Sequence, residues 1–230
     1  MPDIKEFSDH IKVPFKNSDL LLQAFVHRSY LNENPRFRLS HNERLEFLGD
    51  AVLELAVTEV LYEKYPEKPE GELTSFRAAL VNAKMLSVVA EALGMNEFLL
   101  MSKGESKDTG RARQFLLANA LEAVIGAVYL DRGYETAQEF IVENILVRLS
   151  DVIENNLFRD PKSLFQEFAQ EKVGITPSYQ VMKEWGPDHD RNFIVGLYLK
   201  DELVAEGGGH SKQTAEVNAA EKGLVAKHWN

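Results

Sequence analysis

The sequence predicts an all-α domain followed by a small α+β module, and three observations lead to this fold class. Apolar residues recur at the three- and four-residue spacing of helices through residues 1–154. Beyond them the pattern changes to a short amphipathic helix, strand-like alternation and a final helix. The segment 155–161, which contains Asn-Asn and Asp-Pro, has the composition of a linker. We therefore expect domains at 1–154 and 162–230.

Five helical segments are expected in the first domain, and turn-like segments separate them. The predicted helices cover residues 20–26, 45–62, 76–93, 115–130 and 137–153. The predicted breaks are rich in Pro, Gly, Asn or charged residues, and they cover residues 32–35, 66–71, 103–113 and 131–133.

The second domain has the order helix, three strands, helix (αβββα). A short helix is predicted at 163–172, and strands alternate at 178–185 and 192–200 around a turn at 186–190. The third strand and the final helix are expected at 202–206 and 211–228, on either side of the glycines 207–209.

Composition excludes several classes of protein. With 44% hydrophobic and 10% aromatic residues in 230, the chain is not a disordered one. The sequence has no cysteine, which removes disulfides, thiolate zinc sites, iron–sulfur clusters and cysteine nucleophiles. We see no secretory signal at the N-terminus and no window that approaches the about 20 apolar residues of a membrane span. These features favour a cytoplasmic protein without a membrane partner.

Acidic residues form a stripe along the predicted helix 45–62 and the residues just before it. Glu43, Glu46, Asp50 and Glu54 are spaced 3, 4 and 4 apart, which places them on one helix face. Like charges at this spacing repel, so the stripe must be solvated, paired or occupied by a cation.

In the predicted helix 115–130 every residue is apolar or small except Asn119 and Glu122, which share one face. Such a helix is normally buried, and a buried carboxylate costs several kcal/mol unless it is paired or bound to metal. One interpretation makes Glu122 the partner of a distant arginine such as Arg77. The other joins Glu46, Asp50, Asn119 and Glu122 into an oxygen-rich site that suits Mg²⁺, with Mn²⁺ as a possible substitute.

Four segments resemble the ribonuclease III family, and they occur in the family's order. The longest is HNERLEFLGDA at 41–51. The others are AFVHRS at 24–29, EGEL at 70–73 followed by Arg77-Ala78, and LEAVIG at 121–126. The C-terminal module resembles the double-stranded-RNA-binding domain of bacterial members, so the resemblance covers essentially the whole chain.

The resemblance implies a Mg²⁺-dependent endoribonuclease that cuts double-stranded RNA to 5′-phosphate and 3′-hydroxyl ends. Its substrates would be ribosomal-RNA precursors and structured messenger RNAs. By position, Glu46, Asn119 and Glu122 would hold the metal ion, and Asp50 and Glu122 would be catalytic. The family's homodimer implies that Phe47 packs across the dimer interface; an ordinary core phenylalanine is the alternative, and either role leaves it buried.

One residue departs from the family's pattern. Asn119 stands where many members have aspartate, so the site keeps a coordinating oxygen but loses a charge. This favours, as an alternative, a non-catalytic or weakly active scaffold that binds double-stranded RNA. Glu43 and Glu70 lie close to matching family positions and could act outside the direct metal ligands, although Glu43, like Glu54, could equally belong to a solvated face. A third possibility, a helical hydrolase of small phosphates, is disfavoured by the αβββα module.

Expected RNA contacts lie on the second domain. Ser163, Gln166 and Gln170 share one face of its first helix, His189 lies in the turn 186–190, and Lys212 begins its last helix. Double-stranded RNA is read mostly by shape, through ribose hydroxyls and phosphates. A solvated helix face is the alternative for the two glutamines.

The second domain has a negative net charge, so we do not expect it to bind RNA tightly by itself. Residues 160–230 carry 8 Lys and Arg against 11 Asp and Glu, a net charge of −3, and the rest of the chain carries −7. RNA binding should therefore need Mg²⁺ and both domains together. The basic segment 103–113 is either a solvated connector or a second RNA contact. His27 and Arg28 are expected to be structural.

Overall fold

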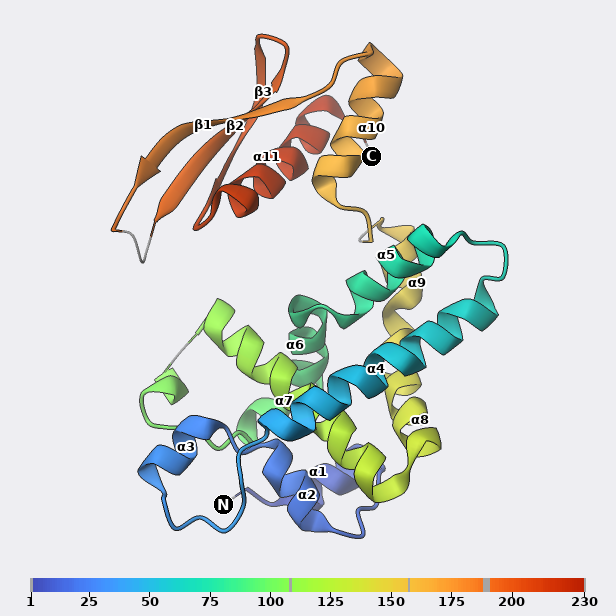
Figure 1. The fold of residues 1–230 in the computed structure, drawn as a ribbon, viewed down its shortest axis with the longest axis vertical. Coiled ribbons are helices and arrows are strands. Elements are labelled where there is room, and N and C mark those ends of the chain that lie inside the picture. Colours follow the sequence, from blue (N-terminus) through green and yellow to red (C-terminus); the bar gives the residue numbers. More distant parts are fainter. Residues whose placement is uncertain (1, 108, 157, 188–190, 230) are drawn as a thin grey trace. The chain divides into compact units, whose positions relative to one another are not determined.

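The computed structural model describes residues 2–107, 109–156, 158–187 and 191–229. It divides into two compact units, Met1–Phe158 and Arg159–Asn230 (Figure 1). The division falls inside the segment 155–161, which the sequence assigns to a linker. The first unit is helical and the second is α+β, so the predicted fold class is confirmed.

The first unit consists of helices of very unequal length. The α-helices are α1 (Ile4–His10), α2 (Ser18–Ala24), α3 (Arg28–Glu33), α4 (Glu43–Lys64), α5 (Glu70–Val81), α6 (Ala83–Ala92), α7 (Arg111–Arg132), α8 (Tyr134–Asn144) and α9 (Leu149–Glu154). The described residues of this unit also form the short 3-10 helices η1 (Met95–Glu97), η2 (Glu105–Lys107) and η3 (Leu146–Arg148).

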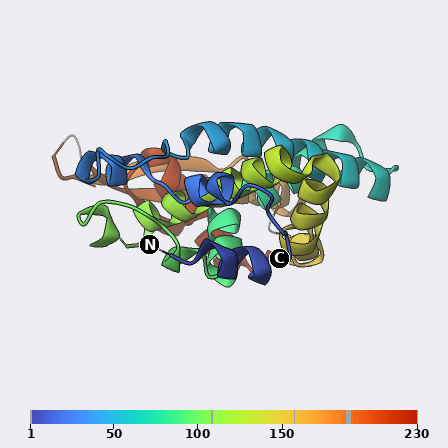
Figure 2. The same cartoon turned by 90° about the horizontal axis from the view of Figure 1, so that it is seen from below.

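Helix α7 forms the centre of this unit. It packs against α2, α4, α6 and α8. Figure 1 shows α4 crossing α7, and Figure 2 shows the blue-to-cyan α4 on one side of the green α7. By length and composition alone, α7 is long and apolar enough to cross a membrane, as is the bent pair α5 and α6 together, but one or two such helices are weak evidence for a span. Moreover, 56% of the apolar window of α7 is buried, which is typical of the core helix of a globular domain.

The predicted helix 76–93 is two helices, α5 and α6, which meet at an angle of 46°. Asn82 lies between them with extended backbone angles, and its side chain accepts a hydrogen bond from the backbone N–H of Met85 at 2.9 Å. An asparagine that caps a helix N-terminus interrupts the backbone while the apolar spacing continues on both sides. Periodicity alone therefore could not detect this break.

The second unit is a three-stranded antiparallel sheet with two helices. Its elements are α10 (Pro161–Val173), β1 (Ser178–Trp185), β2 (Asn192–Leu199), β3 (Glu202–Gly209) and α11 (Lys212–Lys227). The strand order is β1-β2-β3, and α11 packs on β2 and β3 while α10 packs on α11. Phe165, Leu197 and Trp229 are among its buried core residues.

Strand β3 is longer than the sequence predicts, because it includes the glycines 207–209. A Cβ atom on Gly207 would lie 2.2 Å from the carbonyl oxygen of Ala215, and one on Gly209 would lie 2.8 Å from the backbone nitrogen of the same residue. The two glycines therefore allow α11 to lie directly against β3.

Candidate metal centre and RNA-binding face

Two glycines bring α4 and α7 into backbone contact beside the predicted site. A Cβ on Gly49 would lie 1.7 Å from the carbonyl oxygen of Glu122, and one on Gly126 would lie 2.3 Å from that of Leu45. Glycine inside a helix costs about 0.5–1 kcal/mol relative to alanine, and here this cost allows the close crossing. The crossing sets the acidic face of α4 against Glu122. Both glycines occur in the segments that resemble the family, Gly49 in 41–51 and Gly126 in 121–126, but periodicity and spacing indicate no role for them.

The carboxylates at this crossing influence one another electrostatically. Burial, with the nearby charges of Asp50 and Glu46, raises the pKa of Glu122 to about 8. Burial, followed by the charges of Glu43 and Asp50, also raises the pKa of Glu46. Four of the predicted acidic residues are thus brought together. Within the described ranges, none of Glu46, Asp50 and Glu122 has an ion-pair partner.

Arg77 does not pair with Glu122. Its Nη1 donates instead to the hydroxyl of Thr58 at 3.0 Å, so this alternative from the sequence is wrong. Glu54 is exposed, in line with a solvated face, while Glu43 lies 3.7 Å from both Arg28 Nη1 and His41 Nδ1.

A pocket lies next to these carboxylates, and it contains Asn119 and Glu46 together. Its other lining residues are His27, Asn42, Glu43, Leu99, Met101 and Leu116. Carboxylate and amide oxygens are ligands of the kind that Mg²⁺ prefers, so the donor set fits such an ion. In the described part of the chain, no three acidic or histidine side chains already converge as closely as metal ligands. The amide of Asn119 is the neutral donor in this group.

On α10, three predicted RNA-contact residues line one shallow groove. These are Ser163, Gln166 and Gln170, together with Glu167. Two of the three already have partners inside the unit. Ser163 donates to Asp160 through both its backbone N–H and its hydroxyl, at 2.9 and 3.1 Å, and Gln170 Nε2 donates to Thr176 at 2.6 Å.

The other two predicted contacts lie outside this groove. Lys212 is the first residue of α11, and its Nζ lies 5.8 Å from the ring centre of Phe193. His189 lies outside the described residues.

Comparison with known proteins accounts for both units. The family of Ribonuclease-III-like proteins matches residues 17–149, and the double-stranded RNA binding motif matches residues 161–225. Ribonuclease 3 of Borreliella burgdorferi is 43% identical, over 97% of this chain and 91% of that protein. Ribonuclease 3 of Natranaerobius thermophilus is 46% identical, over 95% and 94%.

The chain belongs to the ribonuclease III family. It is therefore an endoribonuclease of the hydrolase class, in a family of metal-dependent nucleases. A solved nuclease domain of ribonuclease III from Campylobacter jejuni, described for flexibility in a region involved in dimer formation, is 39% identical. It aligns with a TM-score of 0.55 over 62% of this chain and 98% of its own length.

In this ribonuclease III chain, Phe47 is exposed rather than buried. Its side chain is 81% exposed, so the alternative of an ordinary core phenylalanine is wrong, and the expected burial is absent within one chain. Leu55 and Tyr62 continue the exposed apolar residues along α4, at 51% and 74% exposure. Residues 47, 55 and 62 are 8 and 7 positions apart, which places them on one helix face.

Glu70 lies at the start of α5, and its charge is not among those that shift the pKa of Glu46 or Glu122. Its Oε1 accepts a hydrogen bond from the hydroxyl of Thr74 at 2.9 Å. The structure therefore groups Glu43 with the metal candidates but gives no such contact for Glu70.

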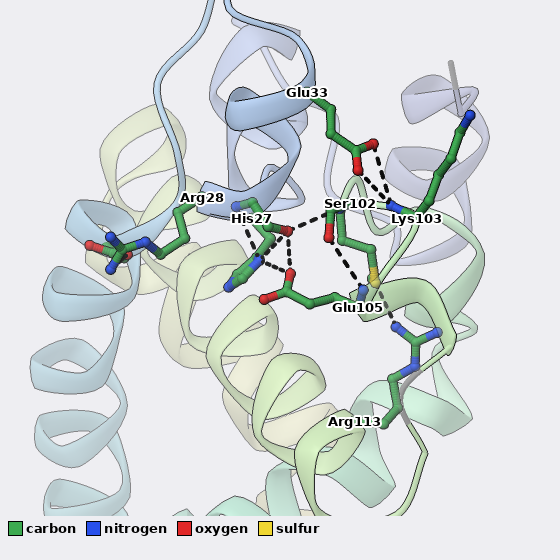
Figure 3. Close-up of polar contacts among 10 residues, drawn as sticks. His27, Arg28, Glu33, Ser102, Lys103, Glu105 and Arg113 are labelled. Atoms are coloured by element: carbon green, nitrogen blue, oxygen red, sulfur yellow. Dashed lines mark hydrogen bonds and ion pairs between the residues drawn. The ribbon is translucent and has the colours of Figure 1, made fainter.

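The basic segment 103–113 is tied into the first unit at several points (Figure 3). The carboxylate of Glu33 accepts from the backbone N–H of Lys103, and Arg113 Nη1 lies 2.8 Å from the sulfur of Met101. The guanidinium of Arg111 lies 5.5 Å from the ring centre of Phe115. Arg113 is thus engaged within the protein, while Lys103, Lys107 and Arg111 are exposed, so both alternatives from the sequence stay open.

Proposed function

We propose that this enzyme is a Mg²⁺-dependent endoribonuclease that hydrolyses double-stranded RNA to 5′-phosphate and 3′-hydroxyl ends. It would process ribosomal-RNA precursors and structured messenger RNAs in the cytoplasm. The observation that carries the proposal is the group of unpaired carboxylates at the α4–α7 crossing, in a chain that also has a double-stranded RNA binding motif.

The metal site is proposed from electrostatics. A buried carboxylate whose pKa is raised by two neighbouring carboxylates loses free energy whenever all three are ionised, and a divalent cation removes this cost. Glu46, Asn119 and Glu122 would hold Mg²⁺, with Mn²⁺ as a substitute. The bound ion would supply Lewis-acid polarisation of the phosphate and a more acidic water. Glu43 would contribute negative charge beside the ligands, and the same role for Glu70 rests on the family position alone.

Asp50 and Glu122 would orient the attacking water. Asp50 is exposed at the crossing and can accept a hydrogen bond from a water on the open side, while the more buried Glu122 faces it across the crossing. A carboxylate aimed at the water aligns it for in-line attack on the phosphorus and can accept its proton.

In the second unit, Ser163, Gln166, Gln170, His189 and Lys212 would bind the RNA minor groove and phosphates. Gln166 has no hydrogen-bond partner among the residues described, so of the three groove residues its side chain is the most available for a hydrogen bond to RNA. With Glu167 in the same groove and a net charge of −3 over residues 160–230, affinity should be weak for this unit alone.

We further propose a homodimer that forms through α4. The exposed face of Phe47, Leu55 and Tyr62 is apolar, and such a face is typical of an interface between protein chains. The Campylobacter jejuni nuclease domain has a region involved in dimer formation, which supports the same assembly here.

The test is cleavage of a long, perfectly paired RNA by the full chain, with Mg²⁺ or with EDTA, beside Glu122→Ala. We expect cutting that requires Mg²⁺ and that the variant loses. Glu54→Ala, on the exposed side of the same acidic stripe, is the matched control and should cut normally.

A weakly active scaffold that binds double-stranded RNA is the second candidate, and Asn119 is the observation that favours it. Duplex binding by the wild type without Mg²⁺-dependent cutting would contradict the proposed nuclease and support the scaffold. Restored cutting by Asn119→Asp would then assign the loss to the missing charge.

A further inference from the structure

An ion pair joins the two helices of the second unit that carry the expected RNA contacts. Lys162 is the second residue of α10, and its Nζ lies 2.5 Å from the Oε2 of Glu216 on α11. Ser163 follows Lys162 in the chain, and Lys212 precedes Glu216 by one helical turn, so the pair lies next to proposed contacts on both helices. Spacing within either helix could not reveal this pair, because its members are 54 positions apart.

The ammonium group of Lys162 has a second contact inside the unit. Its Nζ lies 5.0 Å from the ring centre of Tyr179 on β1, which is within the range of a cation–π contact. The side chains of Lys162 and Glu216 are 33% and 27% exposed, so the pair lies at the surface rather than in the core. A carboxylate and a ring therefore hold the lysine in one position, while part of its side chain stays open to a ligand on the surface.

The surroundings of this pair are unfavourable for an anion. Burial, followed by the charges of Asp160 and Glu216, raises the pKa of the Tyr179 hydroxyl to about 12. Asp160 is fixed at this place, because its side chain caps α10 and accepts from the backbone N–H of Ser163 at 2.9 Å. A phosphate that approaches the start of α10 would therefore meet two carboxylates and a lysine that one of them already neutralises.

A second cation next to the groove on α10 is paired in the same way. Arg159 Nη1 lies 3.5 Å from the Oε2 of Glu167, which lines the groove. This pair is longer than that of Lys162 and Glu216, and its side chains are more exposed. Both cations are thus neutralised by carboxylates of the same unit, and Lys162 is the one held more closely.

We propose that Lys162 is a latent phosphate-binding residue of the second unit, and that Glu216 keeps it neutralised in the free protein. This inference rests on the proposed binding of double-stranded RNA through α10 and α11. A lysine that neutralises a backbone phosphate releases a counterion and strengthens binding. Here the phosphate must first displace a carboxylate that the fold keeps at a high effective concentration. Glu216 therefore lowers the RNA affinity of the second unit.

The experiment measures how full-length Glu216→Gln binds a short RNA duplex, by fluorescence anisotropy in Ca²⁺ at several salt concentrations. The glutamine still accepts a hydrogen bond from Lys162 but no longer neutralises its charge. We expect binding about fivefold tighter than in the wild type, which is the upper end for an exposed charge pair. The slope of the logarithm of the binding constant against the logarithm of the salt concentration should steepen by about 1, as for one added phosphate contact.

Glu202→Gln is the matched control, because it makes the same change in net charge at another ion pair of the unit. Glu202 Oε1 lies 2.8 Å from the Nζ of Lys227. Lys227 is the last of the 16 residues of α11, which places it about 22 Å along the helix axis from Lys212. This exceeds the Debye length of about 10 Å at 0.1 M ionic strength, so the affinity of Glu202→Gln should stay within about twofold of the wild type.

The double variant Lys162→Gln with Glu216→Gln separates a latent lysine from simple repulsion of phosphate by Glu216. It has the net charge of the wild type, and its affinity should return to within about twofold of the wild type, because no lysine is left to gain a phosphate. If the double variant keeps the fivefold gain, Glu216 acts by repulsion alone and the proposal is overturned. Unchanged affinity in Glu216→Gln, or an equal gain in Glu202→Gln, would overturn it as well.

Stability and cleavage supply two further measurements. The melting temperature of Glu216→Gln should stay within about 3 °C of the wild type, since exposed ion pairs contribute little to stability. A lower melting temperature without a change in affinity would make the pair a structural contact only and overturn the proposal. KM for RNA should fall about fivefold in Glu216→Gln, while the Mg²⁺ concentration for half-maximal cleavage stays unchanged. If the wild type binds the duplex but does not cut it in Mg²⁺, the proposed nuclease function fails, while the effect of Glu216 on binding can still be read.

Discussion

The acidic crossing of α4 and α7 and the groove on α10 are both polar regions, but their side chains are satisfied to different degrees. At the crossing, Glu122 is partly buried beside two other carboxylates, and its pKa is raised to about 8. In the groove, Ser163 and Gln170 already have hydrogen-bond partners within the unit. The crossing therefore holds unfavourable electrostatic energy that a bound cation would relieve, whereas the groove is a surface that RNA would contact mainly by shape.

The largest effect is expected from the crossing itself. Glu122→Gln keeps the size of the side chain but removes its charge, and kcat on double-stranded RNA should fall by about a thousandfold, equal to about 4 kcal/mol of transition-state stabilisation. RNA binding without cutting, measured by gel shift in Ca²⁺, should stay within about threefold of the wild type, as a change of that size is worth under about 1 kcal/mol. Normal cleavage by this variant would contradict this difference between the two regions, since the crossing would then contribute no more to cleavage than the groove.

Stability without metal should depend on pH through the same residue. The folded-state pKa of Glu122 is raised from 4.5 to about 8, so the folded protein holds an extra proton across this window. The free energy of unfolding in EDTA should therefore fall as pH rises from 4.5 to 8, by at most about 1.4 kcal/mol per pH unit. When the free energy of unfolding is measured with urea, it should change much less with pH in Glu122→Gln than in the wild type. At pH 8 the variant should be the more stable of the two. Equal slopes in both proteins would contradict the electrostatic account, and exposed Glu54→Gln is the control.

The variant Asn119→Asp tests whether residue 119 is a ligand of the metal ion. The added charge should lower the Mg²⁺ concentration for half-maximal cleavage by about tenfold, or about 1.4 kcal/mol. The same substitution should raise the pKa of Glu122 further in the absence of metal, since it adds another nearby carboxylate. A Mg²⁺ requirement that does not change would place Asn119 outside the ion's ligands.

The smallest effects are expected in the groove. Gln166→Ala should weaken binding of double-stranded RNA by about threefold, the value of one exposed hydrogen bond of about 0.5–1 kcal/mol. Glu167→Gln should strengthen binding by a similar factor at low salt, because it removes a negative charge from the RNA path. Fluorescence anisotropy with a short duplex measures both. A loss of a hundredfold in Gln166→Ala would show that the groove is a specific site rather than a shape-reading surface.

Several elements of this protein were determined by local sequence. The 3, 4 and 4 spacing of Glu43, Glu46, Asp50 and Glu54 places these residues on one helix face whatever surrounds that helix. The strands predicted at 178–185 and 192–200 follow from period-two alternation, and the structure has them at 178–185 and 192–199. The helix predicted at 163–172 is Pro161–Val173 in the structure, because Asp160, which the sequence assigned to the linker, caps a helix that begins with proline. These predictions needed only contacts between neighbours in the chain.

Other features were decided only by the tertiary structure. The bend at Asn82, the exposure of Phe47 and the place of His27 in the pocket that contains Glu46 and Asn119 could not be derived from periodicity. Periodicity shows which face of a helix is apolar, but it does not show which neighbour covers that face or whether the neighbour belongs to the same chain. The close crossing at Gly49 and Gly126 illustrates the difference. The sequence placed carboxylates on two helices, and the contact between the two backbones decided that Glu122 would lie beside Glu46 and Asp50, where burial and repulsion shift its pKa.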